Sequence, residues 1–76
     1  MDINRAATAI EEFVRTYEGV VETQVRASGD DVDVIKIWIE RVATDDPTAW
    51  AVACERAIRS AVPGAVAFRL ELHVES

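Results

Sequence analysis

The chain has 76 residues and carries 14 acidic against 8 basic side chains, a formal net charge of −6 at pH 7. This length accommodates one domain, so we expect residues 1–76 to fold as a single unit. The acidic balance argues against nucleic acid as a partner, because binding to phosphates needs a basic surface. No apolar run approaches the ~20 residues that a membrane-spanning helix needs, so we expect no membrane insertion.

Cysteine usage and the N-terminal sequence bear on the compartment. Cys54 is the only cysteine, which excludes an intramolecular disulfide. The first residues lack the basic and then apolar pattern of a signal peptide. The sequence therefore predicts a cytoplasmic protein, or a cytoplasmic piece of a larger one. Lys36 is the only lysine among the 8 basic residues, and this preference for arginine suggests a GC-rich bacterial genome.

The first element is an amphipathic helix, predicted over residues 3–18. Asp2 is placed to cap its amide groups, and Gly19 suits a left-handed stop at its end. The apolar side chains recur at spacings of three and four, which places them on one face. They are Ile3, Ala6, Ala7, Ile10, Phe13, Val14 and Tyr17.

The period then changes to two, which predicts a hairpin of two strands over residues 20–26 and 32–42. The turn between them, residues 28–31, is Ser-Gly-Asp-Asp. We expect one face of the first strand to carry Val21, Thr23 and Val25. In the second strand Ile35, Ile37 and Ile39 share one face, and Val34, Lys36, Trp38 and Glu40 share the other.

A second helix is predicted over residues 47–62. Asp46 directly precedes Pro47, and this pair is typical of a helix start. Pro63-Gly64 ends the helix. The last strand alternates, with Val66, Phe68, Leu70, Leu72 and Val74 inward and Ala67, Arg69, Glu71, His73 and Glu75 outward.

The order helix-strand-strand-helix-strand predicts an α+β two-layer sandwich. The connection through the second helix makes the second and third strands parallel neighbours, so the three-stranded sheet is mixed. Both helices cover one face of the sheet, because both apolar stripes need the same apolar surface.

The other face of the sheet is then uncovered and mostly charged, and Trp38 stands out on it. A Trp in a solvated row is typical of an interface, so we expect contact through Trp38, Val34, Lys36 and Arg69. The alternative is that Trp38 only lies over the stems of Lys36 and Arg69. Unpaired edge strands offer a second route to association. Either route predicts a homo-oligomer or a protein partner.

Candidates for chemistry are few. His73 shares one side of its strand with Glu71 and Glu75, which makes these three weak candidate metal ligands. Cys54 falls on the apolar stripe of its helix, where a buried, inert thiol is expected. No phosphate-binding, nucleophile-elbow or zinc-protease motif occurs. The sequence therefore predicts a chain that is not an enzyme and has no cofactor.

Two family resemblances extend these inferences. Residues 32–39, the capped helix, Pro63-Gly64 and residues 68–74 resemble the bacterial alkaline-shock envelope-stress family, and Gly19-Val20-Val21 matches one of its landmarks. This resemblance implies a non-enzymatic, self-associating cytoplasmic protein of the envelope-stress response.

The second resemblance is to the cytoplasmic C-terminal domain of cation diffusion facilitator transporters. It rests on Gly19-Val20-Val21 through Arg26, on Ser28-Gly29, and on the ending Leu72-His73-Val74-Glu75. It implies dimerisation and metal sensing, with His73 and Glu75 as the ligands that carry over. Val21 and Thr48 stand where these transporters often have histidines.

The leading interpretation is thus a small acidic module that self-associates or binds a protein partner, with a role in envelope stress. The alternative is a metal-responsive dimerisation domain.

Overall fold

The computed structural model describes residues 3–29, 31–62, 65 and 67–75. The predicted element order is confirmed. The elements are α1 (Ile3–Val14), β1 (Val20–Ser28), β2 (Asp31–Glu40), the short 3₁₀ helix η1 (Arg41–Ala43), α2 (Pro47–Ala61) and β3 (Arg69–Glu75). The expected roles of Asp2, Asp30, Pro63-Gly64 and Val66 lie outside the described residues.

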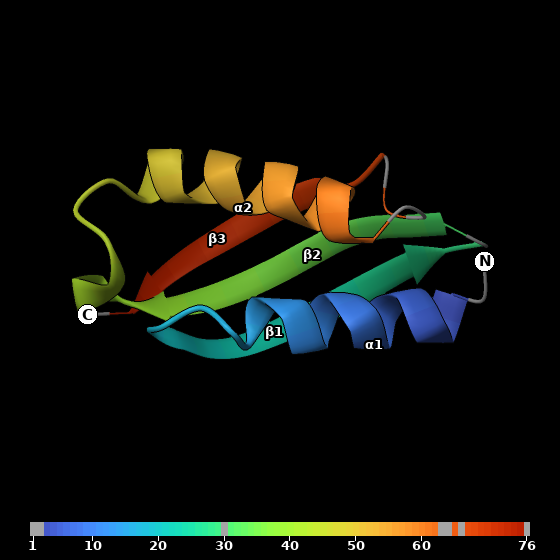
Figure 1. The fold of residues 1–76 in the computed structure, drawn as a ribbon, viewed down its shortest axis with the longest axis horizontal. Helices are drawn as coiled ribbons and strands as arrows, with labels where there is room; N and C mark the ends of the chain where they lie inside the picture. Colours follow the sequence, from blue (N-terminus) through green and yellow to red (C-terminus); the bar gives the residue numbers. More distant parts are fainter. Residues whose placement is uncertain (1–2, 30, 63–64, 66, 76) are drawn as a thin grey trace.

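The sheet has the order β1-β2-β3, and it is mixed as predicted. β1 and β2 form an antiparallel hairpin, and β2 and β3 run parallel. Both helices lie on one face of this sheet, with α1 along the β1 side and α2 over β3 (Figure 1). The molecule is therefore the predicted two-layer α+β sandwich. Within the described residues, no helix combines the length and the apolar character needed to cross a membrane.

The hydrophobic core lies between the sheet and the helices. Its centre is the inner face of β2, where Ile35, Ile37 and Ile39 are fully buried. Ile10 of α1 and Ile58 of α2 are fully buried too. The β-branched isoleucines fit the pleated centre of the sheet, and each contributes roughly 1.5–3 kcal/mol by leaving water.

α1 ends at Val14, four residues before the predicted end. Beyond it the amides of Thr16 and Tyr17 donate to Phe13 and Val14, three residues back, which tightens the chain out of the α-helix. The Thr16 hydroxyl also donates to the Phe13 carbonyl at 2.7 Å. This competition between a threonine side chain and the helix backbone explains the shorter helix.

The predicted inner face of β1 is wrong at one residue. Val20 pairs with Ile39 and Glu22 pairs with Trp38, so Val21 is an extra residue in a β-bulge. Val21 is therefore 52% exposed, and Val20 packs on the core in its place. The pattern of alternation could not predict this, because a bulge shifts the face of every residue on one side of it.

The start of β1 closes tightly on η1. The predicted second strand continues to residue 42, but β2 ends at Glu40 and the chain turns into η1. Gly19 has φ +89° and accepts a hydrogen bond from the Glu40 amide at 2.8 Å. A Cβ at Gly19 would stand 2.5 Å from the Ala43 Cβ. Only glycine satisfies both the conformation and the contact.

α2 begins as predicted. The Asp46 carboxylate accepts a hydrogen bond from the Ala49 amide at 3.1 Å, and Pro47 occupies the first turn. Glu55 and Arg59 form an ion pair one turn apart, with 2.6 Å between their charged atoms. The helix ends at Ala61, and the Val62 amide still donates to the Ile58 carbonyl.

Candidate functional site

The uncovered face of the sheet carries the candidate site. The pairing register places Glu22 of β1, Trp38 of β2 and His73 of β3 side by side across this face. Lys36 likewise lies between Gln24 and Glu71. The face is therefore polar, with one broad aromatic group at its middle strand.

Trp38 and His73 are stacked. Their ring centroids lie 5.0 Å apart, and the ring planes differ by 15°. The parallel register of β2 and β3 produces this contact, because it makes these residues direct neighbours. Trp38 is half-buried and His73 is exposed. The pair forms a flat surface, part of it apolar, that a second molecule can cover.

The other predicted interface residues lie around this pair with unequal exposure. Lys36 is half-buried and Arg69 is exposed. Val34 belongs to the same face but is only 6% exposed between Arg26 and Arg69, so it offers little surface for contact. Arg69 approaches Glu71 at 3.9 Å. This exposed pair contributes little to stability, because water screens it.

The weak metal candidates do not form a cluster. Within the described residues, no three His, Cys, Asp or Glu side chains come together as a group that could hold a metal ion. Glu71, His73 and Glu75 share one side of β3, as predicted, but successive side chains on that side are about 6–7 Å apart. One copy of the chain therefore presents His73 as a single exposed imidazole.

A groove lies between α2 and the outer edge of β3, and the sequence did not predict it. Its volume is about 300 Å³. The lining is mostly apolar: Pro47, Thr48, Ala51, Val52, Glu55, Leu70, Leu72 and Val74. Val52 and Val74 are two of the few large hydrophobic residues that are exposed among those described. The alternation of the last strand predicted Val74 to point inward, and the sequence made no prediction for Val52; the tertiary structure shows that α2 leaves both uncovered.

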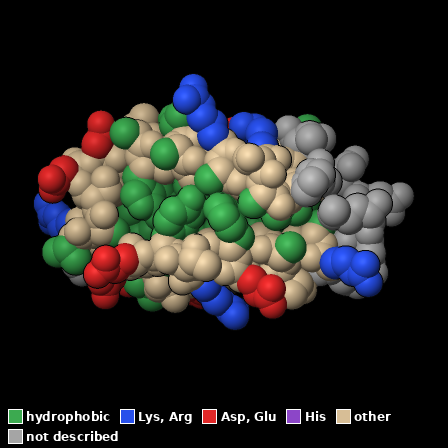
Figure 2. All heavy atoms as spheres, viewed as in Figure 1, with side chains coloured by type: hydrophobic (Ala, Val, Ile, Leu, Met, Phe, Trp, Pro, Cys, Tyr) green, Lys and Arg blue, Asp and Glu red, His purple; other side chains and the backbone are tan. Residues whose placement is uncertain are grey.

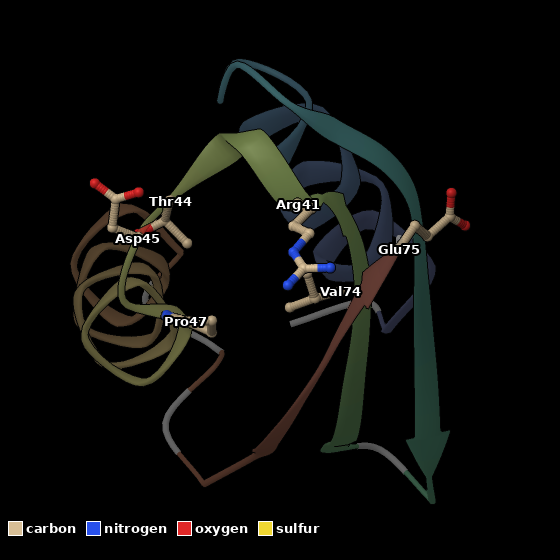
Figure 3. Close-up of a pocket in the computed structure, with 6 residues that line it drawn as sticks. All are labelled: Arg41, Thr44, Asp45, Pro47, Val74 and Glu75. Carbon is tan, nitrogen blue, oxygen red and sulfur yellow. The ribbon is translucent and has the colours of Figure 1, made fainter.

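A second cavity of about 500 Å³ adjoins this groove at Pro47 and Val74. Arg41 extends into the space between Pro47 and Val74, whereas Asp45 and Glu75 point away from it (Figure 3). Thr44 lines the same cavity, but its hydroxyl already contacts the backbone of Asp46. No acidic side chain among the described residues forms an ion pair with Arg41. The groove therefore ends at a guanidinium group.

Aromatic side chains connect the two helices in the helix layer, away from the uncovered face of the sheet. Tyr17 makes edge contacts with Phe13 at 5.6 Å and with Trp50 at 5.7 Å between ring centroids. Hydrophobic side chains follow the seam between the helices (Figure 2). These rings are partly buried against the core, so the seam closes the core rather than forming a separate site.

Cys54 is buried, as expected. Burial raises the pKa of its thiol to about 11, so the thiol stays protonated and is a poor nucleophile at neutral pH. Burial also raises the pKa of Tyr17, and the neighbouring Cys54 adds to this effect. This part of the core therefore provides no reactive group.

Comparisons with known proteins identify the fold. No family model matches the chain, and no curated protein matches it either. Solved structures of the C-terminal domain of MamM, a cation diffusion facilitator, do match. One variant in a nickel form is 16% identical, with a TM-score of 0.56 over 96% of this chain and 99% of that chain. A variant in a copper form is 15% identical, with a TM-score of 0.56 over 96% of this chain and 98% of that chain.

A third MamM structure, a cysteine-to-serine variant, is 15% identical, with a TM-score of 0.56 and coverage of 96% of each chain. At these identities the comparison establishes a shared fold. It agrees with the second of the two family resemblances. None of the three structures is an alkaline-shock protein, so the envelope-stress interpretation gains no support from them. The chain thus has the fold of the MamM C-terminal domain.

Proposed function

We propose that this chain is a non-enzymatic, cytoplasmic self-association domain of the cation diffusion facilitator type, and that two copies meet through the uncovered sheet face. The observation that carries the proposal is the Trp38–His73 stack on that face. A half-buried indole supplies a large apolar contact at low entropic cost. The fold shared with the MamM domain supports the same conclusion.

The charges around the stack suit an interface of two identical surfaces. Lys36 and Arg69 share this face with Glu22, Glu71 and Glu75. A two-fold axis places each residue of one copy opposite a residue of the other, so a face with both signs of charge can match itself. Charges at the rim then favour one orientation over others.

Sedimentation velocity over a range of protein concentrations tests the proposal. Trp38→Glu adds a charge at the centre of the contact, and we expect it to weaken self-association by at least tenfold. Val42→Glu is the matched control, because Val42 is 87% exposed in η1 and lies outside this face. A monomer at all concentrations, or an equal effect of both variants, would contradict the proposal.

A second candidate function, metal-responsive pairing, is favoured by the exposed imidazole of His73. One copy lacks a three-ligand cluster among its described residues, but two copies would bring together two His73 rings with nearby carboxylates. The MamM structures include nickel and copper forms of variants of that domain. Calorimetric titration with Zn²⁺ and with Ni²⁺ tests this function. We expect heat of binding that His73→Ala removes, and a flat titration would exclude metal sensing.

A further inference from the structure

The open edge of β3 and the groove beneath α2 form a second surface, which shares only the outward side chains of β3 with the proposed function. The uncovered sheet face carries Trp38, whereas this groove lies on the helix side, along the outer edge of the sheet. Among the described residues β3 pairs with β2 alone, so its other edge keeps backbone groups that no described strand pairs. We propose that this edge binds one extended peptide segment of a partner protein as a fourth strand, with alternating apolar and charged side chains.

The inner side chains of β3 determine half of the pattern. Leu70, Leu72 and Val74 line the groove together with Val52 of α2. A strand added to β3 presents every second side chain to this groove, because side chains alternate between the two faces. Those positions of the peptide must therefore be apolar.

The outer side chains of β3 determine the other half. They are Arg69, Glu71, His73 and Glu75. In an antiparallel pair, residues directly opposite share a face, and opposite charges there are favourable. The peptide therefore needs an acid opposite Arg69, a base opposite Glu71, an acid opposite His73 and a base opposite Glu75.

A peptide with the sequence of β3 satisfies this pattern when it pairs antiparallel with β3 so that the two Leu72 residues are opposite each other. Arg69 then faces Glu75, Glu71 faces His73, and Leu70 faces Val74. A shift of two residues puts Glu71 opposite Glu71, or opposite Glu75. A shift of one residue turns charged side chains into the groove. The charges and the groove together therefore define one register.

Although this pattern is self-complementary, the helix layer argues against a second copy of the whole domain. A two-fold axis at the edge of β3 would place the two strands about 4.8 Å apart. Because α2 lies over β3 (Figure 1), the two α2 helices would then come closer than the 8–10 Å that packed helices need. An isolated strand brings no helix with it, so it fits where a second domain does not.

Arg41 defines one end of the peptide. The groove leads into the cavity where the Arg41 guanidinium lies beside Val74 (Figure 3). In the antiparallel register the N-terminal end of the peptide reaches this cavity. An acidic residue just before the base opposite Glu75 faces the groove side and meets Arg41, as a charge-assisted contact.

The probe is therefore an acetylated synthetic peptide with the sequence Glu-Arg-Leu-Glu-Leu-His-Val-Glu. In the control peptide each Glu is replaced by Arg and the Arg is replaced by Glu, and the apolar residues are unchanged. Binding is measured by NMR titration of the Trp38→Glu variant, so that association through the uncovered sheet face does not interfere. We expect shifts at β3 and in the first turns of α2, and about tenfold weaker binding of the control peptide.

Variants of the chain locate the site. Val52→Arg fills the groove at an exposed helical position, and we expect it to reduce peptide affinity by at least about tenfold. Val42→Arg, at an exposed residue outside the groove, serves as its control and leaves affinity unchanged. Arg41→Ala reduces affinity for this peptide by about threefold, and it has no effect on a peptide without the leading Glu.

Four results would overturn the proposal: no shifts, shifts confined to the uncovered sheet face, tighter binding of the charge-exchanged peptide, or equal effects of Val52→Arg and Val42→Arg. A self-association that Val52→Arg abolishes would also overturn it, because a second copy would then occupy the groove. The effect of Trp38→Glu on self-association bears only on the proposed function, so the two proposals can fail separately.

Discussion

The two edges of the sheet are built differently, and the difference shows where the molecule is closed and where it is open to a partner. β1 is bulged at Val21, and its pairing with β2 shifts again where β2 has one extra residue, Asp33, whereas β3 pairs with β2 without a shift over its whole length. Bulges disturb the pairing edge of a strand, and they protect β1 against a further strand. β3 has no such protection.

The two helices differ in the same way as the two edges of the sheet. α1 has 12 residues and buries Ala6, Ile10 and Val14, spread along its length. α2 has 15 residues but buries only Cys54, at its midpoint, and Ile58, so none of its first seven residues is buried. The first turns of α2 therefore stand away from β3 and leave the groove. The half formed by α1 and β1 is closed, and the half formed by α2 and β3 is open.

The largest predicted effect tests how much the close contact between Gly19 and Ala43 contributes to the stability of the closed half. Gly19→Ala forces a Cβ to within 2.5 Å of the Ala43 Cβ at a positive φ. We expect a loss of about 3 kcal/mol in the free energy of unfolding, from backbone strain and steric overlap together. Urea denaturation followed by circular dichroism measures it.

Gly29→Ala is the matched control at the other end of β1. Gly29 also has a positive φ, +63°, but a Cβ there meets no atom within 4 Å. The loss is then about 1 kcal/mol, from the backbone conformation alone. Equal losses for the two variants would show that the contact with Ala43 does not hold the closed half.

The second prediction concerns the core beneath α2. Burial raises the pKa of the Cys54 thiol from 9.0 to about 11. Between these values the unfolded chain loses the thiol proton and the folded chain keeps it, so stability falls as the pH rises. This group contributes a decrease of at most about 1.4 kcal/mol per pH unit in that window, and nothing below it.

Unfolding in urea at pH 8, 9.5 and 10.5 measures this decrease, with Cys54→Ala as the reference. The wild-type chain must lose stability faster than Cys54→Ala between pH 9 and 11, because the variant has no thiol to ionise. Parallel curves for the two proteins would mean that the thiol is open to water in the folded chain.

The third prediction tests the start of α2, at the open half. Asp46→Ala removes the acceptor for the Ala49 amide and costs about 1 kcal/mol. Asp45→Ala removes an exposed neighbour of equal charge, and we expect a change within about 0.5 kcal/mol. Thermal denaturation of both variants measures the difference. If both cost the same, the loss of one surface charge accounts for it and the cap does not.

The fourth prediction is a gain in stability. Thr23 lies on the inner side of β1 opposite Ile37, and its hydroxyl is buried without a hydrogen-bond partner among the described residues. Thr23→Val keeps the shape and removes the unpaired hydroxyl, so we expect a gain of about 1 kcal/mol. Thr23→Ser keeps the hydroxyl and loses a methyl group, so it must destabilise. A loss of stability in Thr23→Val would indicate that the hydroxyl is satisfied.

Periodicity was sufficient to predict the elements and their order, and the helical connection between β2 and β3 predicted their parallel pairing. The isoleucines of β2 alternate without interruption, and Asp46-Pro47 specifies a helix start through local chemistry. Two local features explain where the predictions were wrong, namely the end of α1 near Thr16 and the inner face of β1 at Val21. There a side-chain hydrogen bond and one extra residue change the structure without changing the apolar pattern.

The candidate site was predicted only in outline. The alternation placed Trp38 and His73 on one face, but the stack between them depends on a register that links residues far apart in the sequence. Val34 has an outward position and is nevertheless covered. The groove of β3 could not be foreseen at all, because it results from where α2 sits and from no property of Val52 or Val74 alone.

The positions of the two tryptophans have a practical consequence. Trp38 lies against an imidazole on the uncovered side of the sheet, and Trp50 lies against Tyr17 on the helix side. The chain thus carries two tryptophan fluorophores, one in each layer. With either one replaced by phenylalanine, the emission of the other reports on its own layer, and events on opposite sides of the sheet can be followed without an attached dye.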